Sequence, residues 1–131
     1  MSALILDSNA YSYFMGGAPA AVQAVHAAHE IQIPLIVLGE LLAGCAMGSH
    51  IKSHRETLAR FMVSPRVHLM NPDEKTAQQY ADVYKWLREH GRPIPVNDMW
   101  IAALARQHRM PLLTFDQHFA AIPGVDLASA A

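Results

Sequence analysis

The sequence predicts an α/β fold, namely a three-layer sandwich with a central parallel sheet of four to five strands. Two observations favour this fold class. Short apolar runs alternate with longer segments in which apolar residues recur at helical spacing. The first run, residues 3–6, contains no polar residue, which is typical of a strand buried on both faces of a parallel sheet. Strands that alternate with helices in this way form parallel sheets with right-handed crossovers.

Length and composition indicate one globular domain over residues 1–131. Apolar residues make up 52% of the chain and charged residues 16%, which is unlike a disordered chain. No apolar run approaches the roughly 20 residues of a membrane span, and the N-terminus lacks the basic region of a signal peptide. We therefore expect a cytoplasmic protein without a membrane segment. The single cysteine, Cys45, cannot form an intrachain disulfide and is expected to be a small buried residue.

In the first half of the chain, glycine and proline mark the ends of the expected elements. Gly16 ends a first helix, and Pro19 lies near the start of a second. Pro34 is awkward inside a central strand, so it either lies at the edge of a strand or marks its end. The expected elements are a strand over 3–6, helices over 8–15 and from about residue 20, a strand over 31–36, and helices over 37–47 and 49–62.

The second half of the chain combines two helices with three short strands. Asp73 is a suitable N-cap for a long amphipathic helix, which Gly91 ends. The expected elements are a strand over 67–70, a helix over 74–90, an extended linker over 92–96, a helix over 99–108, strands over 110–114 and 125–127, and a frayed end over 128–131. The expected core face of the long helix is the stripe Ala77, Tyr80, Ala81, Tyr84 and Leu87.

Two aspartates follow expected strands. Asp7 comes directly after the first strand, and Asp116 comes one or two residues after the fourth. Parallel strands bring their carboxyl ends to one edge of the sheet, where ligands bind in open α/β folds. The alternative for Asp7 is that it only caps the next helix.

Two further acids are candidates for the same edge. Glu40 is an isolated charge in the first turn of an apolar helix that follows the second strand. It is either a surface residue stabilised by the helix dipole or a side chain that points into a pocket. Asp98, like Asn97 before it, is a candidate N-cap of the next helix. A helix that starts after a long linker can begin at either edge of the sheet, so the placement of Asp98 stays open.

Four carboxylates at one edge would repel one another strongly. Two unit charges about 5 Å apart cost roughly 3 kcal/mol at an effective dielectric constant near 20. Such a cluster is reasonable only where cations neutralise it or some members are protonated. Oxygen ligands without cysteine or histidine favour Mg²⁺ or Mn²⁺, and these ions bind phosphate oxygens and activate water. The residues therefore suggest metal-dependent phosphodiester hydrolysis. With the four acids in one site, the remaining surface would be mildly basic, which suits an anionic substrate; the alternative is an ordinary near-neutral protein.

Four stretches of the chain resemble a known family, the PIN-domain ribonucleases, and specifically the VapC-type toxins of bacterial toxin–antitoxin pairs. The matching stretches are Leu6-Asp7-Ser8-Asn9, Glu40-Leu41-Leu42-Ala43-Gly44, Asn97-Asp98-Met99-Trp100-Ile101-Ala102-Ala103 and Leu113-Thr114-Phe115-Asp116-Gln117-His118-Phe119. They occur in the family's order and span nearly the whole chain. The third and fourth stretches are the most specific.

The resemblance implies a PIN-like fold and a toxin that hydrolyses RNA endonucleolytically, with tRNA as one candidate substrate. It implies that Asp7, Glu40, Asp98 and Asp116 form an acidic metal-binding quartet, so that Asp98 converges with the others. Three aspartates would hold one Mg²⁺ or Mn²⁺, and Glu40 would act through a water or a second ion. Asn9 and Thr114 match polar positions beside the site. The resemblance also implies a homodimer and a VapB-type antitoxin as partners.

Other functions are weighed against this one. A non-catalytic RNA- or protein-binding module would leave the four acids as a coincidence. A phosphoryl-transfer enzyme of the haloacid-dehalogenase kind needs a second aspartate where Asn9 stands, and a receiver domain needs a lysine that the run 110–115 lacks.

The remaining polar side chains are expected to have structural or solvent-exposed positions. His50 and His54 could ligate a metal from one helix face, but surface histidines are the better interpretation. His118 is expected to pack rather than to take part in chemistry. The basic residues of the expected helix over 49–62 should form a solvated face, with phosphate contact as the alternative: Lys52, Arg55 and Arg60.

Overall fold

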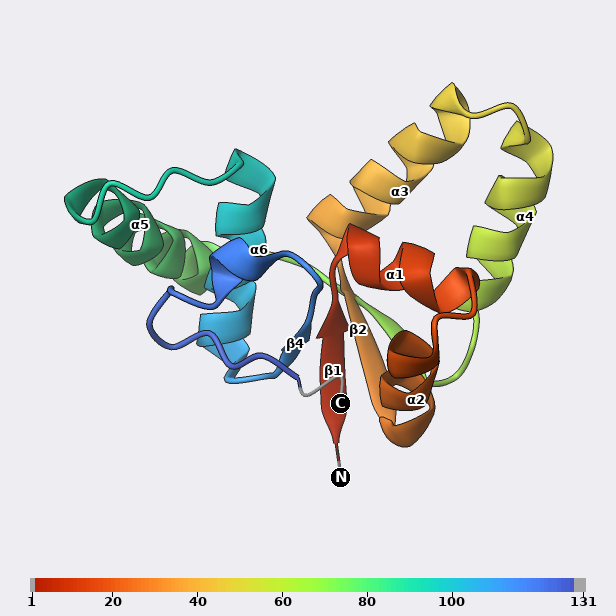
Figure 1. Cartoon of the computed structure of the whole chain (residues 1–131), viewed down its shortest axis with the longest axis horizontal. Coiled ribbons are helices and arrows are strands. Elements are labelled where there is room, and N and C mark those ends of the chain that lie inside the picture. Colours follow the sequence, from red (N-terminus) through yellow and green to blue (C-terminus); the bar gives the residue numbers. More distant parts are fainter. Residues whose placement is uncertain (1, 129–131) are drawn as a thin grey trace.

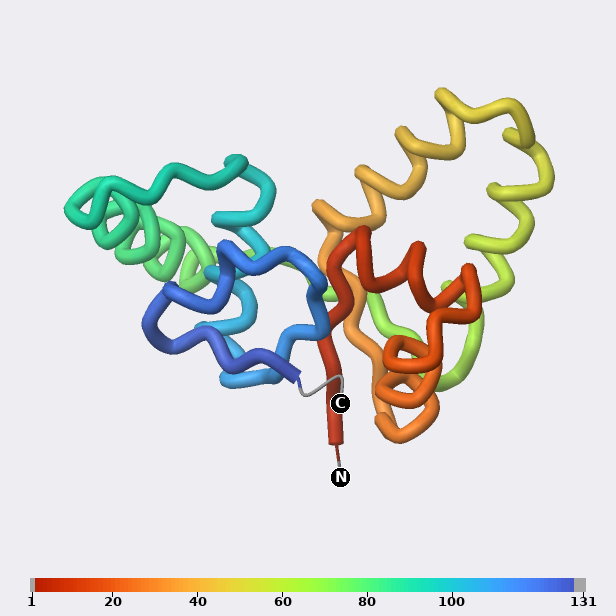
Figure 2. Tube along the Cα trace, in the orientation of Figure 1, coloured from red at the N-terminus to blue at the C-terminus, as the bar shows by residue number. Residues whose placement is uncertain are grey.

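A four-stranded parallel sheet forms the centre of the structure, a computed structural model that describes residues 2–128 (Figure 1). The strand order is β3-β2-β1-β4, and every pairing is parallel. The strands are β1 (Ala3–Leu6), β2 (Glu30–Pro34), β3 (Val67–Met70) and β4 (Leu112–Leu113). Figure 2 shows the red β1 between the orange β2 and the blue segment that contains β4. The carboxyl ends of β1 and β4, far apart in sequence, are therefore neighbours.

Helices flank this sheet on both sides. In Figure 1, α5 and α6 lie to the left of β1 and β2, whereas α1, α2, α3 and α4 lie to the right. The helices are α1 (Ser8–Met15), α2 (Pro19–Ala27), α3 (Leu35–Met47), α4 (Ile51–Met62), α5 (Glu74–Glu89) and α6 (Val96–His108), and a short 3₁₀ turn, η1, spans Gln117–Phe119. The predicted three-layer α/β sandwich with a parallel sheet is thus confirmed. None of the helices among residues 2–128 has the length and hydropathy needed to cross a membrane.

The core forms between the sheet and the most apolar helix faces. Ile5 and Leu6 of β1 are fully buried, as expected for a central strand covered on both faces. The middle of α6 is buried all round over residues 101–105, so this helix lies against the sheet with α5 packed outside it. Cys45 is buried too, as predicted. Strand β1 and the middle of helix α6 therefore both belong to the buried core.

Proline determines where two helices begin, and both begin earlier than the sequence predicted. Pro34 ends β2 and is the N-cap of α3, so Glu40 lies in the second turn of that helix and not in the first. Pro95 is likewise the N-cap of α6, and its carbonyl accepts the N–H of Asp98 at 3.0 Å. The interpretation of Asn97 or Asp98 as the N-cap is therefore wrong, because Asp98 lies inside the first turn.

The C-terminal strands are shorter than predicted. Only Leu112 and Leu113 of the expected strand 110–114 pair with β1, and the expected strand 125–127 is reduced to a single bridge between Leu127 and Leu112. Ala128 is not frayed, because its N–H donates to the Leu112 carbonyl at 2.8 Å. The rest of the expected frayed end, 129–131, lies outside the described residues.

The predicted core stripe of α5 is largely wrong. Asp73 caps the helix as predicted, and its side chain accepts the Thr76 N–H in a capping box. The fully buried positions are Thr76, Val83 and Leu87, of which only Leu87 belongs to the predicted stripe. Tyr80 packs partly against the core and stacks on Trp100, whereas the other members of the stripe are exposed: Ala77, Ala81 and Tyr84. Aromatic residues at helical spacing mimicked a core face here.

We predict that Ile5→Ala destabilises the protein far more than the same substitution on the surface. Ile5 is fully buried in the central strand, so its truncation leaves a cavity and should lower the free energy of unfolding by about 2–5 kcal/mol. Ile51→Ala, at an exposed position in α4, should change it by less than about 0.5 kcal/mol. Urea unfolding of both variants measures this. Equal effects would contradict the central position of β1.

Candidate functional site

Asp7 lies at the junction of β1 and α1 and serves both elements. It follows the last residue of the strand and is the N-cap of the helix, where its Oδ1 accepts the Ala10 N–H at 2.9 Å. Its Oδ2 accepts the hydroxyl of Thr114, which follows β4. The side chain is buried, with the residue 3% exposed. The two interpretations of Asp7 therefore both hold, since it caps a helix and also lies at the carboxyl edge of the sheet.

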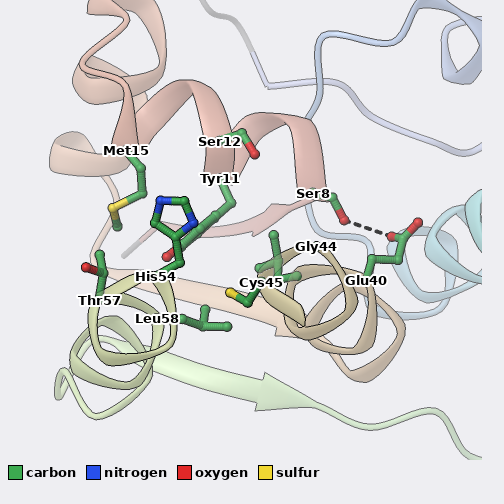
Figure 3. Close-up of a pocket in the computed structure, with 11 residues that line it drawn as sticks. Ser8, Tyr11, Ser12, Met15, Glu40, Gly44, Cys45, His54, Thr57 and Leu58 are labelled. Carbon is green, nitrogen blue, oxygen red and sulfur yellow. Dashed lines mark hydrogen bonds between the residues drawn. The ribbon is translucent and has the colours of Figure 1, made fainter. Parts of the chain in front are cut away.

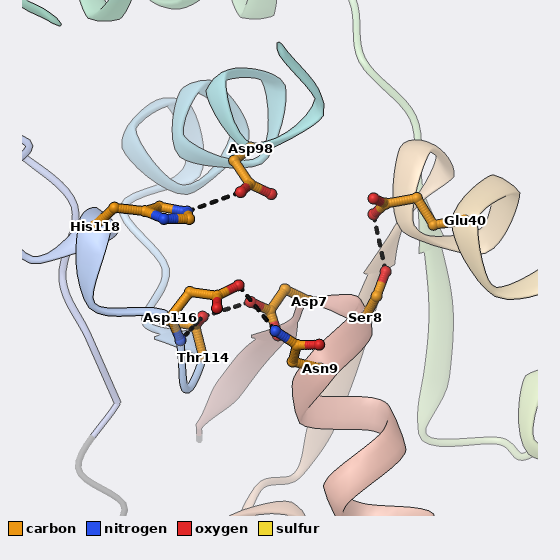
Figure 4. A network of polar contacts seen from close by, with 8 residues as sticks. All are labelled: Asp7, Ser8, Asn9, Glu40, Asp98, Thr114, Asp116 and His118. Atoms are coloured by element: carbon orange, nitrogen blue, oxygen red, sulfur yellow. Dashed lines mark hydrogen bonds and ion pairs between the residues drawn. The ribbon is translucent and has the colours of Figure 1, made fainter. Parts of the chain in front are cut away.

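Asp116 lies beside Asp7, at the next strand end. Its N–H donates to the Thr114 hydroxyl oxygen at 3.1 Å, and its Oδ2 accepts the Asn9 amide at 2.9 Å. Asn9 and Thr114 thus link the segment after β4 to the segment after β1 (Figure 4). Both were supporting residues in the sequence interpretation; Thr114 contacts both aspartates, and Asn9 contacts Asp116.

Asp98 reaches the same group of acids from the first turn of α6. Its Oδ2 lies 2.7 Å from Nε2 of His118, which belongs to η1. Ligand atoms of Asp98, Asp116 and His118 all lie within 4.8 Å of one another, at half-buried positions. The expectation that His118 only packs is therefore wrong. Its position two residues after Asp116 was the available signal, because a short turn returns the ring to the site.

Glu40 faces these acids from α3. Its Oε1 accepts the Ser8 hydroxyl at 2.8 Å, and Figure 4 shows its carboxylate directed toward the side of the site occupied by Asp98. The open question about Glu40 is resolved in favour of an inward-facing, half-buried side chain. Ser8 was not identified as a site residue from the sequence, although it directly follows Asp7.

Burial and mutual repulsion make two of these carboxyl groups weaker acids. Desolvation by burial is the main cause that raises the pKa of Asp7, and the charges of Asp116 and Asp98 raise it further. The hydrogen bonds that Asp7 accepts oppose this shift. Desolvation also raises the pKa of Asp98, with Glu40 and Asp116 adding to the effect and His118 opposing it. The charges of neighbouring acids therefore affect the pKa values of both Asp7 and Asp98.

The donor set fits a hard divalent cation. Carboxylate oxygens from three chain segments meet where burial and repulsion disfavour their ionised forms, and a cation would offset both costs. Oxygen ligands of this kind suit Mg²⁺ or Mn²⁺. A bound cation would thus account for four acids at one edge of the sheet.

An apolar pocket adjoins the acids on the side of Glu40. It has a volume of about 460 Å³ and lies between α1, α3 and α4 (Figure 3). Ser8 and Glu40 stand at one end of it, and Tyr11, Cys45 and Leu58 are among the side chains that line the rest. The acidic site is therefore continuous with an apolar surface.

The other polar candidates lie away from the acids. His50 and His54 are exposed, and their rings are 5.9 Å apart between centroids, as expected for surface histidines. The basic residues of α4 are exposed and form the solvated face expected of them: Lys52, Arg55 and Arg60.

Comparisons with known proteins find relatives over nearly the whole chain. The sequence matches the family model of the PIN domain over residues 4–125. It is 31% identical to Ribonuclease VapC4 of Mycobacterium tuberculosis over 101 aligned residues. These residues make up 77% of this chain and 78% of the relative. The fold is similar to that of VapBC2 from Rickettsia felis, solved bound to a DNA fragment from its promoter. The TM-score is 0.87 at 24% identity, over 96% of this chain and 97% of the other. VapBC-5 from Mycobacterium tuberculosis gives a TM-score of 0.74 at 26% identity, over 96% and 94% of the two chains.

We predict that Asp7→Asn stabilises the metal-free protein at neutral pH. Asparagine retains an N-cap acceptor for the Ala10 N–H but removes a buried charge. Because folding raises the pKa of Asp7, the wild type loses stability as pH rises from about 4 through that raised pKa, whereas the variant does not. The variant's advantage should therefore be absent near pH 3.5 and full above the raised pKa. Urea unfolding in EDTA across pH 3.5–7.5 measures it.

The matched control for this prediction is Asp126→Asn, which removes an exposed acid elsewhere in the chain. It should shift stability by less than about 0.5 kcal/mol at all these pH values. An Asp7→Asn variant that is less stable than the wild type at pH 7 would contradict the prediction. That result would mean that the lost hydrogen bond from Thr114 outweighs the relieved burial of charge.

Proposed function

The chain belongs to the PIN-domain family and to the VapC ribonucleases within it, and from this we propose that it is a metal-dependent endoribonuclease of a toxin–antitoxin pair. The observation that carries the proposal is the convergence of Asp7, Asp98 and Asp116, with Glu40 facing them. The reaction is the hydrolysis of an RNA phosphodiester bond.

The proposed metal-binding residues are Asp7, Asp98 and Asp116, with Glu40 nearby. A bound Mg²⁺ or Mn²⁺ would neutralise phosphate charge, lower the pKa of water and stabilise the leaving oxygen. Glu40 would accept a hydrogen bond from the attacking water and so orient it, because Ser8 occupies only one of its two oxygens. Asn9 donates a hydrogen bond to Asp116 and Thr114 donates one to Asp7, and these bonds fix the positions of the two carboxylates.

The proposed partners follow from the relatives. The similar structures are complexes of VapC with VapB, so we propose that a VapB-type antitoxin binds this chain too. We also propose that residues 1–131 form one PIN-like domain that assembles as a homodimer and acts in the cytoplasm, where its RNA substrate is found. A non-catalytic binding module is not favoured, because relatives with the same fold are named ribonucleases and all four acids are present.

We predict that the purified protein cleaves RNA with Mg²⁺ or Mn²⁺ and not with EDTA. Asp7→Asn and Asp98→Asn should each abolish cleavage, because each removes a charged ligand while keeping the size of the side chain. Cleavage is followed on total RNA and on tRNA by gel, and circular dichroism establishes that both variants are folded. Asp126→Asn, with the same chemical change at an exposed position, should cleave like the wild type.

One result would reveal a contaminant, and another would contradict the proposed function. Cleavage that survives both EDTA and the two substitutions would come from a contaminant. A wild-type protein that neither cleaves RNA nor binds Mn²⁺ by calorimetry would refute the metal site and favour the non-catalytic module.

We predict that the homodimer is detectable in solution. Light scattering should give a mass near twice the 14.4 kDa of one chain at micromolar concentration. A mass of one chain at all concentrations tested would contradict the proposed assembly but would leave the metal site untouched.

A further inference from the structure

Each of the four acids accepts a hydrogen bond from a side chain of another segment or a neighbouring residue. Thr114 donates to Asp7, Asn9 donates to Asp116, and Ser8 donates to Glu40. For Asp98 the only such partner among the described residues is His118. His118 therefore takes for Asp98 the place that a hydroxyl or an amide takes for the other three.

The His118 ring is the donor when Asp98 is ionised, as a cation site requires. An ionised carboxylate offers only lone pairs, so in the 2.7 Å contact between Nε2 and Oδ2 the hydrogen is then on Nε2. That distance is typical of a charge-assisted hydrogen bond. Figure 4 shows the second oxygen of Asp98 turned away from His118, toward the middle of the acidic group. One oxygen is thus held while the other stays available.

The position of Asp98 explains why it needs such a partner. Its backbone is fixed in the first turn of α6, but that leaves both of its side-chain torsions free. Repulsion from Glu40 and Asp116 would favour rotation of its carboxylate away from them. The ring of His118 is itself steadied by the neighbouring Phe119, whose centroid lies 4.8 Å away and which is fully buried.

We infer that His118 is a positioning residue that donates Nε2–H to Oδ2 of Asp98 and so orients the other oxygen of Asp98 for a divalent ion. This inference rests on the metal site of the proposed function. Outer hydrogen bonds to metal ligands are worth about 10- to 100-fold in metal affinity. Because Nε2 donates its hydrogen to Asp98, His118 acts on the ion through Asp98 and not as a ligand itself.

Mn²⁺ binding to the full chain tests the inference without RNA. Calorimetry compares the wild type with His118→Leu, which keeps much of the volume but has no donor, and with His118→Gln, which keeps an N–H donor. His108→Leu, at an exposed position at the far end of α6, is the matched control. Thermal unfolding in EDTA establishes that each variant is folded.

We expect His118→Leu to weaken Mn²⁺ binding about 10- to 100-fold. His118→Gln should restore most of this loss, and His108→Leu should bind like the wild type. Spin-echo spectroscopy of Mn²⁺ bound to the wild type should show no directly coordinated imidazole nitrogen. This combination separates a hydrogen-bonding role from one of packing.

Three results would overturn the inference while leaving the proposed function standing. These are wild-type affinity in His118→Leu, equal losses in the leucine and glutamine variants, or the signal of a coordinated imidazole nitrogen. A wild-type protein without Mn²⁺ affinity would overturn the proposed function together with this inference.

Discussion

The structure of the site depends on one constraint, which is the repulsion among carboxylates that the fold holds at one edge of its sheet. The protein does not relieve this repulsion by separating the acids, since Asp7 and Asp98 both have raised pKa values that reflect burial and neighbouring charge. It fixes each carboxylate by a hydrogen bond from a neutral donor or from a ring N–H. Neutral donors hold the acids in place without cancelling their charge, which leaves the negative charge that the proposed cation site needs.

The parallel sheet accounts for how segments distant in sequence supply these acids. Because β1 lies between β2 and β4, the residues that follow these strands emerge at the same edge. Glu40 arrives from the helix after β2, and Asp116 from the turn after β4. Asp98 comes from the start of α6, which is buried against the sheet. The core in which β1 and α6 are buried is therefore also the part of the fold that determines the spacing of the acids.

The sequence was sufficient to predict the fold class and the shared sheet edge of Asp7 and Asp116, because burial on both faces and strand-end carboxylates leave strong local signals. The residues alone left Glu40 and Asp98 open, and only the resemblance to PIN-domain ribonucleases implied that they join the other two acids. The sequence was less informative where a contact joins distant segments. Nothing local indicates that Ser8 meets Glu40 or that His118 turns back toward Asp98. The helix starts were misjudged because proline at an N-cap displaces the usual polar residue, as at Pro95. Only tertiary packing distinguishes an aromatic stripe at a helix edge from a core face.

The shortness of β4 has a consequence for how the site opens. This strand pairs with β1 over only two residues, and a single bridge between Leu112 and Leu127 joins its other side to the C-terminal segment. It leads directly into the turn that carries Thr114, Asp116 and His118. Segments with few backbone pairings open at a lower free energy than fully paired central strands. Detachment of this one segment would remove the proposed ligand Asp116 and two supporting donors together, while Asp7 stayed in place. Amide exchange in residues 112–119 would then report on the integrity of the site. An ion bound by both Asp7 and Asp116 would stabilise the attachment of the C-terminal part of the chain to β1.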